Sequence, residues 1–283
     1  MTIVKYLNPR NDIVFKKIFG TEKNKDILIH FINDVIVEPG QPQVTKVKLL
    51  NPHQFPDIAV QKQSIVDVLC EEKDGAKYIV EMQVAKVEGF EKRAQHYAAR
   101  VYGSQAAKGG DYSGLKAIIF LAITEYNMFP KKKGYKCTHW ILDKDTHERD
   151  LKDFSFTFIE LPKFSKKLEN LVTYEDKWCY FFKHADNPDN VDELVANSPE
   201  IIKKACHVIE SHNWTKEELI QYEERERIAT DAQSTLLAWK NEGIAEGEAK
   251  GIMTVAKKML AKGKDIKEIA EVTGLSEDEI KNG

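Results

Sequence analysis

The longest uninterrupted apolar run in the chain, Ala117 to Ile123, limits the possible folds more than any other feature of the sequence. It lies inside a predicted strand, Leu115 to Thr124, in which polar and apolar residues do not alternate. A strand of this kind is buried on both faces, as in sheets that carry helices on either side. The run is also far shorter than the ~20 residues of a membrane-spanning helix, and the amino terminus lacks the apolar region of a secretory signal. We therefore expect neither a transmembrane nor a secreted protein.

Hydrophobic periodicity and turn residues place this strand in an α/β order of elements. Two amphipathic helices open the chain, strands and one long helix follow, and two further strands come after the buried one. After Pro162 the pattern is helical. The predicted ranges are 12–19 and 25–37 for the first helices, 44–50, 64–72 and 77–84 for the first strands, 88–108 for the long helix, and 115–124, 135–142 and 154–161 for the last strands.

These elements predict a mixed sheet flanked by helices, followed by an all-helical carboxyl-terminal extension. We expect an α/β core over residues 1–164, a helical extension over 165–240, and a tail over 241–283.

The net charge, the cysteine spacing and the absence of certain motifs exclude several kinds of binding site. A net charge of −3 excludes attachment to nucleic acid by bulk charge, but it allows a local basic groove. The four cysteines have no short spacing, which argues against a zinc site and fits reduced thiols in the cytoplasm. The sequence has no Walker loop, no G-x-G-x-x-G motif and no metal-binding histidine spacing, so we expect no nucleotide cofactor.

Two carboxylates interrupt a predicted β-hairpin that is otherwise strongly apolar. Asp67 lies in the segment 65–69, and Glu81 lies in the segment 78–83. An ionised carboxylate in such a setting is destabilising unless it is paired, hydrogen-bonded or bound to a metal. Glu81 and Gln83 share one face of their strand, because successive side chains alternate between faces.

The length of the hairpin loop decides whether Asp67 joins this face. A two-residue loop places Asp67 opposite Met82, on the wrong side, whereas a three-residue loop places Asp67 opposite Glu81. Three-residue loops end in a left-handed residue, for which Gly75 is suited. The sequence therefore favours one polar cluster of Asp67, Glu81 and Gln83.

Such a cluster suits Mg²⁺, which takes oxygen ligands and keeps several waters, one of which can attack a phosphodiester. The alternative is an ordinary edge strand whose polar side chains face water, and the spacing of Glu81 and Gln83 alone does not exclude it.

The order of Asp67, then Glu81-x-Gln83 on the next strand, then a helix, resembles the PD-(D/E)XK nuclease superfamily, with glutamine in place of its last lysine. More closely, the chain resembles the recombination-promoting nuclease and transposase family of bacteria. The residues that carry this closer resemblance are Asn11-Asp12-Ile13-Val14-Phe15-Lys16-Lys17-Ile18-Phe19-Gly20, Asn24-Lys25-Asp26-Ile27-Leu28, Ile79-Val80-Glu81-Met82-Gln83, Phe90-x-x-Arg93-x-x-x-Tyr97, Glu160-Leu161-Pro162-Lys163-Phe164 and the glycine-punctuated tail.

The resemblance implies a restriction-endonuclease-like fold and metal-dependent cleavage of DNA. It makes Asp67 and Glu81 metal ligands and places Gln83 where many relatives carry lysine. Because an amide cannot act as a general base or carry positive charge, the resemblance does not identify the group that orients the attacking water.

One face of the helix after the hairpin supplies further candidates. Phe90, Arg93, Tyr97 and Gln105 fall within an arc of about 120°. Arg93 suits a scissile phosphate because of its planar fork, or it pairs with a neighbouring glutamate. Tyr97 and Gln105 are candidate DNA contacts. The alternative for Tyr97 is a place in the core, and the alternative for Gln105 is a contact with the backbone of a strand.

Asp12 on the first helix is a further candidate metal ligand. Such acids supply a ligand or an outer-shell bond in some members of the superfamily. The alternative is that Asp12, which follows Asn11, stabilises the first helical turn through the helix dipole.

Two features mark the tail. Gly243, Gly247 and Gly251 recur every four residues, which suggests self-association of helices or, alternatively, a flexible hinge. The last segment resembles a helix-turn-helix, with a capping box at Ser276 and Glu279. Its excess of acids disfavours DNA binding, so we expect a helical packing or oligomerisation module.

The sequence thus predicts a cytoplasmic, bacterial-type, Mg²⁺-dependent DNA endonuclease linked to recombination or mobile elements. In this interpretation Asp67 and Glu81 bind the ion, and Gln83 and Arg93 position water and phosphate. One alternative is an inactive nuclease-like scaffold that binds DNA or protein, and Gln83 is the residue that keeps it open. Another is a strand-transferring transposase, which would give joined DNA products rather than breaks alone.

Overall fold

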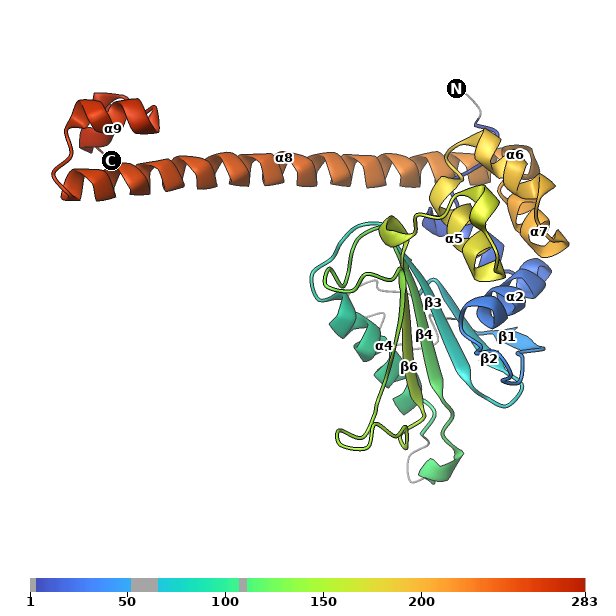
Figure 1. Cartoon of the computed structure of the whole chain (residues 1–283). Helices are drawn as coiled ribbons and strands as arrows, with labels where there is room; N and C mark the ends of the chain where they lie inside the picture. The colour runs from blue at the N-terminus through green and yellow to red at the C-terminus, as the bar shows by residue number, and fades with distance from the viewer. Residues whose placement is uncertain (1–3, 52–65, 107–110, 283) are drawn as a thin grey trace. The chain divides into compact units, whose positions relative to one another are not determined.

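A six-stranded mixed sheet with helices on both faces forms the centre of the protein (Figure 1). The computed structural model describes residues 4–51, 66–106 and 111–282. The strand order is β1-β2-β3-β4-β6-β5, in which β3, β4 and β6 run parallel and the other neighbours are antiparallel. The strands are β1 (Val47–Leu49), β2 (Val68–Glu72), β3 (Lys77–Gln83), β4 (Ile118–Thr124), β5 (Lys136–Trp140) and β6 (Phe154–Glu160).

Strand β4 confirms that the apolar run is buried on both faces. Phe120 and Ala122 lie in the core beside helix α4 (Phe90–Gly103), whereas Leu121 and Ile123 lie in the core of the opposite face. Both cores need apolar residues at consecutive positions, which explains why the strand does not alternate.

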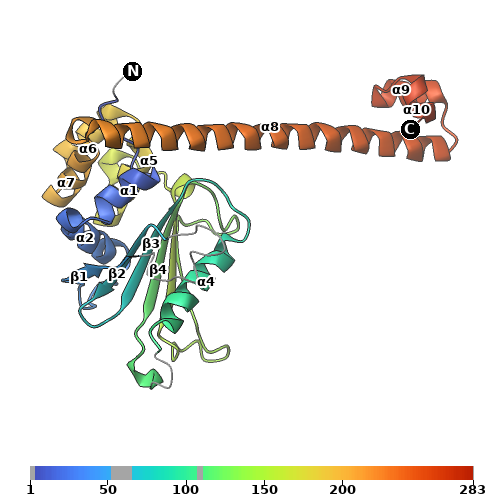
Figure 2. The ribbon, with the colours of Figure 1, turned by 180° about the vertical axis from the view of Figure 1, so that it is seen from behind.

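The other helices of the sheet domain pack on the face opposite α4 (Figure 2). Their shared core is rich in aromatic rings; the centroid of the Phe19 ring lies 4.8 Å from that of Phe31 and 6.0 Å from that of Trp178. These helices are α1 (Asp12–Phe19), α2 (Lys25–Val35), α5 (Tyr174–His184), α6 (Pro188–Ala196) and α7 (Glu200–Val208). Helices α5 to α7, which lie in the predicted helical extension, bury their apolar faces in the same core as α1 and α2.

Side-chain caps explain where two of these helices begin. Asn11 accepts a hydrogen bond from the main-chain N–H of Ile13, and Asp12 lies in the first turn of α1, where a negative charge is favourable. Thr173 and Asp176 form a reciprocal capping box at the start of α5.

The hairpin between β2 and β3 has the predicted three-residue loop. The N–H of Glu72 donates to the carbonyl of Ala76 across the loop, and Gly75 has the positive φ of +93° that such a loop requires. Strand β2 begins at Val68 rather than at residue 64, and residues 64 and 65 lie outside the described residues.

The chain divides into two compact units, Met1–Arg225 and Glu226–Gly283. Helix α8 (Lys216–Ala261) begins in the first unit and continues into the second. In the second unit Ala256, Ile269 and Ile280 form a small core between the end of α8 and the helices α9 (Ile266–Thr273) and α10 (Glu277–Asn282). The predicted capping box is present, because Ser276 Oγ accepts from Glu279 N and Glu279 Oε2 accepts from Ser276 N.

Two further observations concern the class of protein. All four cysteines are free, as the sequence predicted. Within the described ranges, no helix has both the length and the apolar character needed to cross a bilayer.

Candidate active site

The hairpin brings Asp67 and Glu81 together. Val68 pairs with Val80 in the β2–β3 register, so Asp67, one step before the strand, stands opposite Glu81. The main-chain N–H of Met82 donates to Asp67 Oδ2 at 2.9 Å, which holds this carboxylate at the edge of β3. The register therefore confirms the pairing predicted from the three-residue loop.

Gln83 connects Glu81 to helix α4. The amide Nε2 of Gln83 donates to Glu81 Oε2 at 3.0 Å, and its Oε1 accepts from Arg93 Nη2 at 2.5 Å. Arg93 thus contacts the amide, not a neighbouring glutamate, which was the alternative left open by the sequence. Because both ends of the amide are engaged, Gln83 fixes the orientation of the Glu81 carboxylate.

Glu81 is a buried acid whose environment disfavours its charged form. The residue is 3% exposed, and Oε1 of its carboxylate has no hydrogen-bond partner among the described residues. Burial, followed by the nearby Asp67 carboxylate, raises the pKa of Glu81 well above its ordinary value, against the opposing effect of Arg93. Burial likewise raises the pKa of Asp67. Two desolvated carboxylates side by side, one with an unpartnered oxygen, are suited to receive a cation.

Helix α1 adds a lysine that the sequence analysis missed. Lys16 Nζ lies 3.4 Å from Asp67 Oδ1 and 3.9 Å from Asp12 Oδ2. Asp12 also lies 3.9 Å from Arg225 Nε, and its charge contributes to the raised pKa of Asp67. Asp12 is therefore near the pair, and its role as a metal ligand stays a prediction. The only sequence signal for Lys16 is its position one helical turn after Asp12.

Helix α4 places two of its predicted residues at the pair. Tyr97 is 4% exposed, and its hydroxyl has no hydrogen-bond partner among the described residues. Burial raises the pKa of Tyr97, and the charges of Arg93, Glu81 and Asp67 all act on it, which places the phenol at the site. Tyr126, which the sequence analysis also missed, has a second buried and unpartnered hydroxyl, and burial raises its pKa to about 12.

Gln105 does not join this site. Its amide donates to the carbonyl of Lys116 at 2.9 Å and accepts from the N–H of Lys116 at 3.1 Å. Lys116 precedes β4, whereas Glu81 stands beside Ala122 near the other end of that strand. A contact of Gln105 with DNA stays a prediction, separate from the carboxylate pair.

Comparison with protein-family models identifies the chain. A model described as PD-(D/E)XK nuclease family transposase matches residues 9–238. The chain belongs to this family. A second model, described as the C-terminal HTH domain of the Rpn/YhgA-like nuclease family, matches residues 250–282, which cover α9 and α10. No curated protein and no solved structure matches the chain.

Family membership makes a restriction-endonuclease-like fold and a divalent metal the expectation, so the site has to be tested for its fit to such an ion. No group of three or more His, Cys, Asp and Glu side chains that could hold a metal occurs in the described part of the chain. Mg²⁺ does not need one, because it commonly binds one or two carboxylates and keeps several waters. Asp67 and the unpartnered Oε1 of Glu81 supply such a pair in this PD-(D/E)XK domain. The residues present therefore fit the ion.

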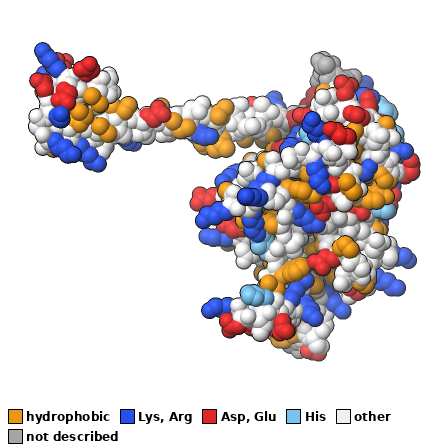
Figure 3. Space-filling model, viewed as in Figure 1, with side chains coloured by type: hydrophobic (Ala, Val, Ile, Leu, Met, Phe, Trp, Pro, Cys, Tyr) orange, Lys and Arg blue, Asp and Glu red, His pale blue; other side chains and the backbone are white. Residues whose placement is uncertain are grey.

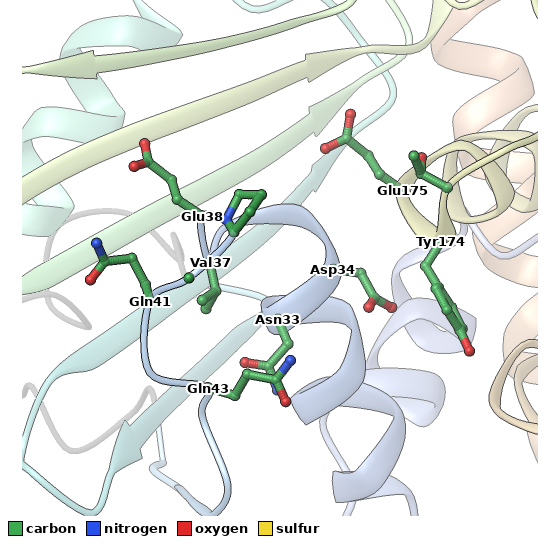
Figure 4. A pocket seen from close by; sticks show the side chains of 11 residues that line it. Asn33, Asp34, Val37, Glu38, Gln41, Gln43, Tyr174 and Glu175 are labelled. Carbon is green, nitrogen blue, oxygen red and sulfur yellow. The ribbon is translucent and has the colours of Figure 1, made fainter.

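Two cavities of this family member lie elsewhere. One of about 280 Å³ lies between the end of α2 and the start of α5 (Figure 4). It contains Asp34, which accepts from Trp178 Nε1 at 2.8 Å, and Glu175, which is paired with Lys136. Another, of about 310 Å³, lies between α1 and α7 and has a basic lining. Neither lining includes a residue of the carboxylate pair.

The surface of the nuclease-family unit carries mixed charge. Figure 3 shows basic and acidic side chains interspersed on the visible face. The mixed charge of this face agrees with the near-neutral net charge of −3 of the whole chain.

Proposed function

We propose that the protein is a metal-dependent DNA endonuclease that acts in recombination or in the movement of mobile elements in the cytoplasm of a bacterium. The observation that carries the proposal is the buried pair of Asp67 and Glu81, which the predicted hairpin register brings together beside Gln83 and Arg93. Membership of the PD-(D/E)XK nuclease family supports hydrolysis of a phosphodiester as the reaction.

In this proposal Asp67 and Glu81 hold one Mg²⁺, which on binding lowers the pKa of a water and offsets charge at the phosphorus. Gln83 orients Glu81 through its amide, and Arg93 anchors Gln83 from helix α4. Tyr97 offers a hydroxyl donor to the DNA backbone from the same helix. In the reaction the oxygen of water bonds to phosphorus, the bond from phosphorus to one sugar oxygen breaks, and a proton passes from the water through solvent to that oxygen.

The experiment that tests the proposal is incubation of the purified protein with supercoiled plasmid, with and without Mg²⁺. We expect relaxed and linear DNA only with the ion, and none from Asp67→Ala. Circular dichroism of Asp67→Ala checks that its fold is retained. Cleavage by Asp67→Ala at the wild-type rate would contradict the assignment of this residue.

A second candidate function is a nuclease-like scaffold without activity, and Gln83 is the observation that favours it. Both ends of the Gln83 amide are engaged, and an amide carries no positive charge for the phosphate. Binding of the plasmid without any cleavage across Mg²⁺, Mn²⁺ and Ca²⁺ would favour the scaffold.

We also propose that the carboxyl-terminal unit contacts DNA and a second copy of the chain. Its match to an HTH domain supports DNA binding, although the acidic character of α9 and α10 weakens this. The exposed apolar residues of α8, among them Leu236 and Trp239, support self-association.

A further inference from the structure

Many relatives carry a positively charged lysine at the carboxylate pair, and this chain has Gln83 in its place. Gln83 cannot supply that charge. Its Nε2 donates to Glu81 Oε2 and to the carbonyl of Met82, and its Oε1 accepts from Arg93. A phosphodiester that approaches two carboxylates needs a cationic donor, because charge develops on its oxygens as the water attacks. Another element has to provide it.

Lys16 is placed to do so. Its ammonium forms an ion pair with Asp67 at 3.4 Å, and it reaches the pair from helix α1. Its side chain is 41% exposed against 10% for Asp67, so Lys16 borders the solvent from which a substrate enters. Its contacts to Asp67 and to Asp12 are both longer than an ordinary charged hydrogen bond. The ammonium of Lys16 therefore loses little interaction energy when it turns toward a phosphate.

Arg93, a second cation at the site, is engaged with Gln83 and Phe90. It donates to Gln83, and its guanidinium stacks 4.8 Å from the centre of the Phe90 ring, although its buried Nε has no hydrogen-bond partner among the described residues. Moving it to a phosphate would release the amide that orients Glu81. Lys16 carries its charge on a flexible stem with three donors, which allows it to follow a phosphate.

We propose that Lys16, on the first helix, takes the place of the lysine that the β3 strand lacks and donates to a non-bridging oxygen of the scissile phosphate. The assignment rests on the proposed nuclease function. No covalent bond to Lys16 forms, and its proton stays on the ammonium while the phosphorus–oxygen bonds exchange.

The test compares Lys16→Met with the wild type by two measurements on the full chain. We expect the single-turnover rate of plasmid cleavage in Mg²⁺ to fall about 100-fold, the usual loss when one electrostatic donor at a reacting group is removed. We expect the affinity for Mn²⁺, measured by isothermal titration calorimetry without DNA, to stay equal or to rise, because a cation next to Asp67 opposes a second cation. A residue that only held Asp67 in place would instead weaken Mn²⁺ binding when it is removed.

Two rescues and one control sharpen the comparison. Lys16→Arg keeps the charge, so its cleavage rate is expected to stay within about 10-fold of the wild-type rate. The double variant that adds Gln83→Lys to Lys16→Met is expected to cleave at least about 10-fold faster than Lys16→Met. Lys17→Met is the matched control. Lys17 is on the same helix and pairs with Glu218 at 2.7 Å, outside the site, so its loss removes an equal charge and an ion pair from α1. Its rate is expected within about 3-fold of the wild type, because the charged contacts of Lys17 are with Glu218 and Trp214 and not with the carboxylate pair.

The outcomes separate the two proposals. Three outcomes overturn the assignment of Lys16 alone. They are cleavage by Lys16→Met at the wild-type rate, a loss of its Mn²⁺ affinity in proportion to the loss of its cleavage rate, and a cleavage rate that neither Lys16→Arg nor the added Gln83→Lys raises above that of Lys16→Met. A wild type that binds no Mn²⁺ and cleaves no DNA overturns the nuclease function, and the role of Lys16 falls with it.

Discussion

Two buried glutamates near the ends of β3 and β6, parallel strands that β4 separates, have opposite environments. Glu81 on β3 has one carboxylate oxygen without a partner among the described residues. Glu160 on β6 is fully buried, forms an ion pair with Lys163, and accepts from the N–H of Phe129 at 2.8 Å. Burial with a partner is compatible with stability, whereas burial without one opposes it. The contrast suggests that Glu81 is kept for function.

Glu81→Gln is therefore expected to stabilise the metal-free protein and to abolish cleavage. Because the pKa of Glu81 is raised, the folded state binds its proton more tightly than the unfolded state does. The free energy of unfolding of the wild type falls as the pH rises from the ordinary carboxyl pKa of about 4.3 toward the raised one. At pH 7 the variant should therefore be more stable than the wild type, because it removes the charge that burial and the Asp67 carboxylate disfavour. Urea unfolding from pH 4 to pH 8 measures the difference.

Glu160→Gln is the matched control for this substitution. It removes the charge of a buried glutamate that has a partner, so it leaves Lys163 unpaired and should lower the free energy of unfolding by about 1–3 kcal/mol. Mg²⁺ should raise the unfolding temperature of the wild type and of Glu160→Gln, but not that of Glu81→Gln. Equal loss of stability in both variants would contradict a functional origin of the strain at Glu81.

Tyr97→Phe separates a core role from a contact with DNA. The buried hydroxyl of Tyr97 has no partner among the described residues, so its removal should leave stability unchanged or raise it by up to about 1 kcal/mol. If the hydroxyl donates to the DNA backbone, the same variant should cleave about 10-fold more slowly, since one hydrogen bond of about 1.4 kcal/mol is lost. Thermal unfolding and single-turnover cleavage, measured together, decide between the two roles. Unchanged cleavage would assign Tyr97 to the core alone.

At the scale of the element, the hairpin loop controls the site. Gly75 has φ of +93°, and a Cβ added there would lie 2.8 Å from Lys116 Cγ. We expect Gly75→Val to lower the free energy of unfolding by about 1–3 kcal/mol and to reduce cleavage, because a change of loop moves Asp67 away from Glu81. An Asn side chain at position 75 would contact the same Lys116 side chain, but Asn tolerates a positive φ. Gly75→Asn should therefore lower the free energy of unfolding by less than Gly75→Val does. Chemical denaturation compares the two variants, and equal losses would assign the cost to crowding.

The hairpin also shows how far the sequence predicts this site. Strand alternation and the loop glycine are local signals, and they were enough to predict that Asp67, Glu81 and Gln83 share a face. The contact of Lys16 with Asp67 depends on how α1 packs against the sheet, which no local pattern encodes. The buried hydroxyl of Tyr126 depends on the fold of the chain after β4 in the same way. Helix α4 was predicted with its buried face correct, and it ends at Gly103, before the predicted end at residue 108.

At the scale of the whole molecule, the second unit buries little of α8. Leu236 is 55% exposed and Trp239 is 67% exposed, although both residues are large and apolar. At about 100° per residue, both lie on one face of the helix with Gly243 and Gly247. Apart from the nearby backbone of α8 itself, no atom of the described residues lies within 4 Å of where a Cβ of either glycine would be, so a second helix can approach this face.

We expect this face to hold two copies of the chain together in solution. Replacing Leu236 and Trp239 by Glu should weaken association at least about 10-fold, because exposed tryptophans commonly dominate interfaces and a buried, unpaired charge is costly. Ser234→Glu with Asn241→Glu is the matched control. It adds the same charge to the opposite face of the same helix and should leave association unchanged. Sedimentation velocity over a range of concentrations measures each variant. A wild type that sediments as a monomer at all concentrations, or a control that dissociates as readily as the first pair, would show that the apolar face of α8 does not hold two copies together.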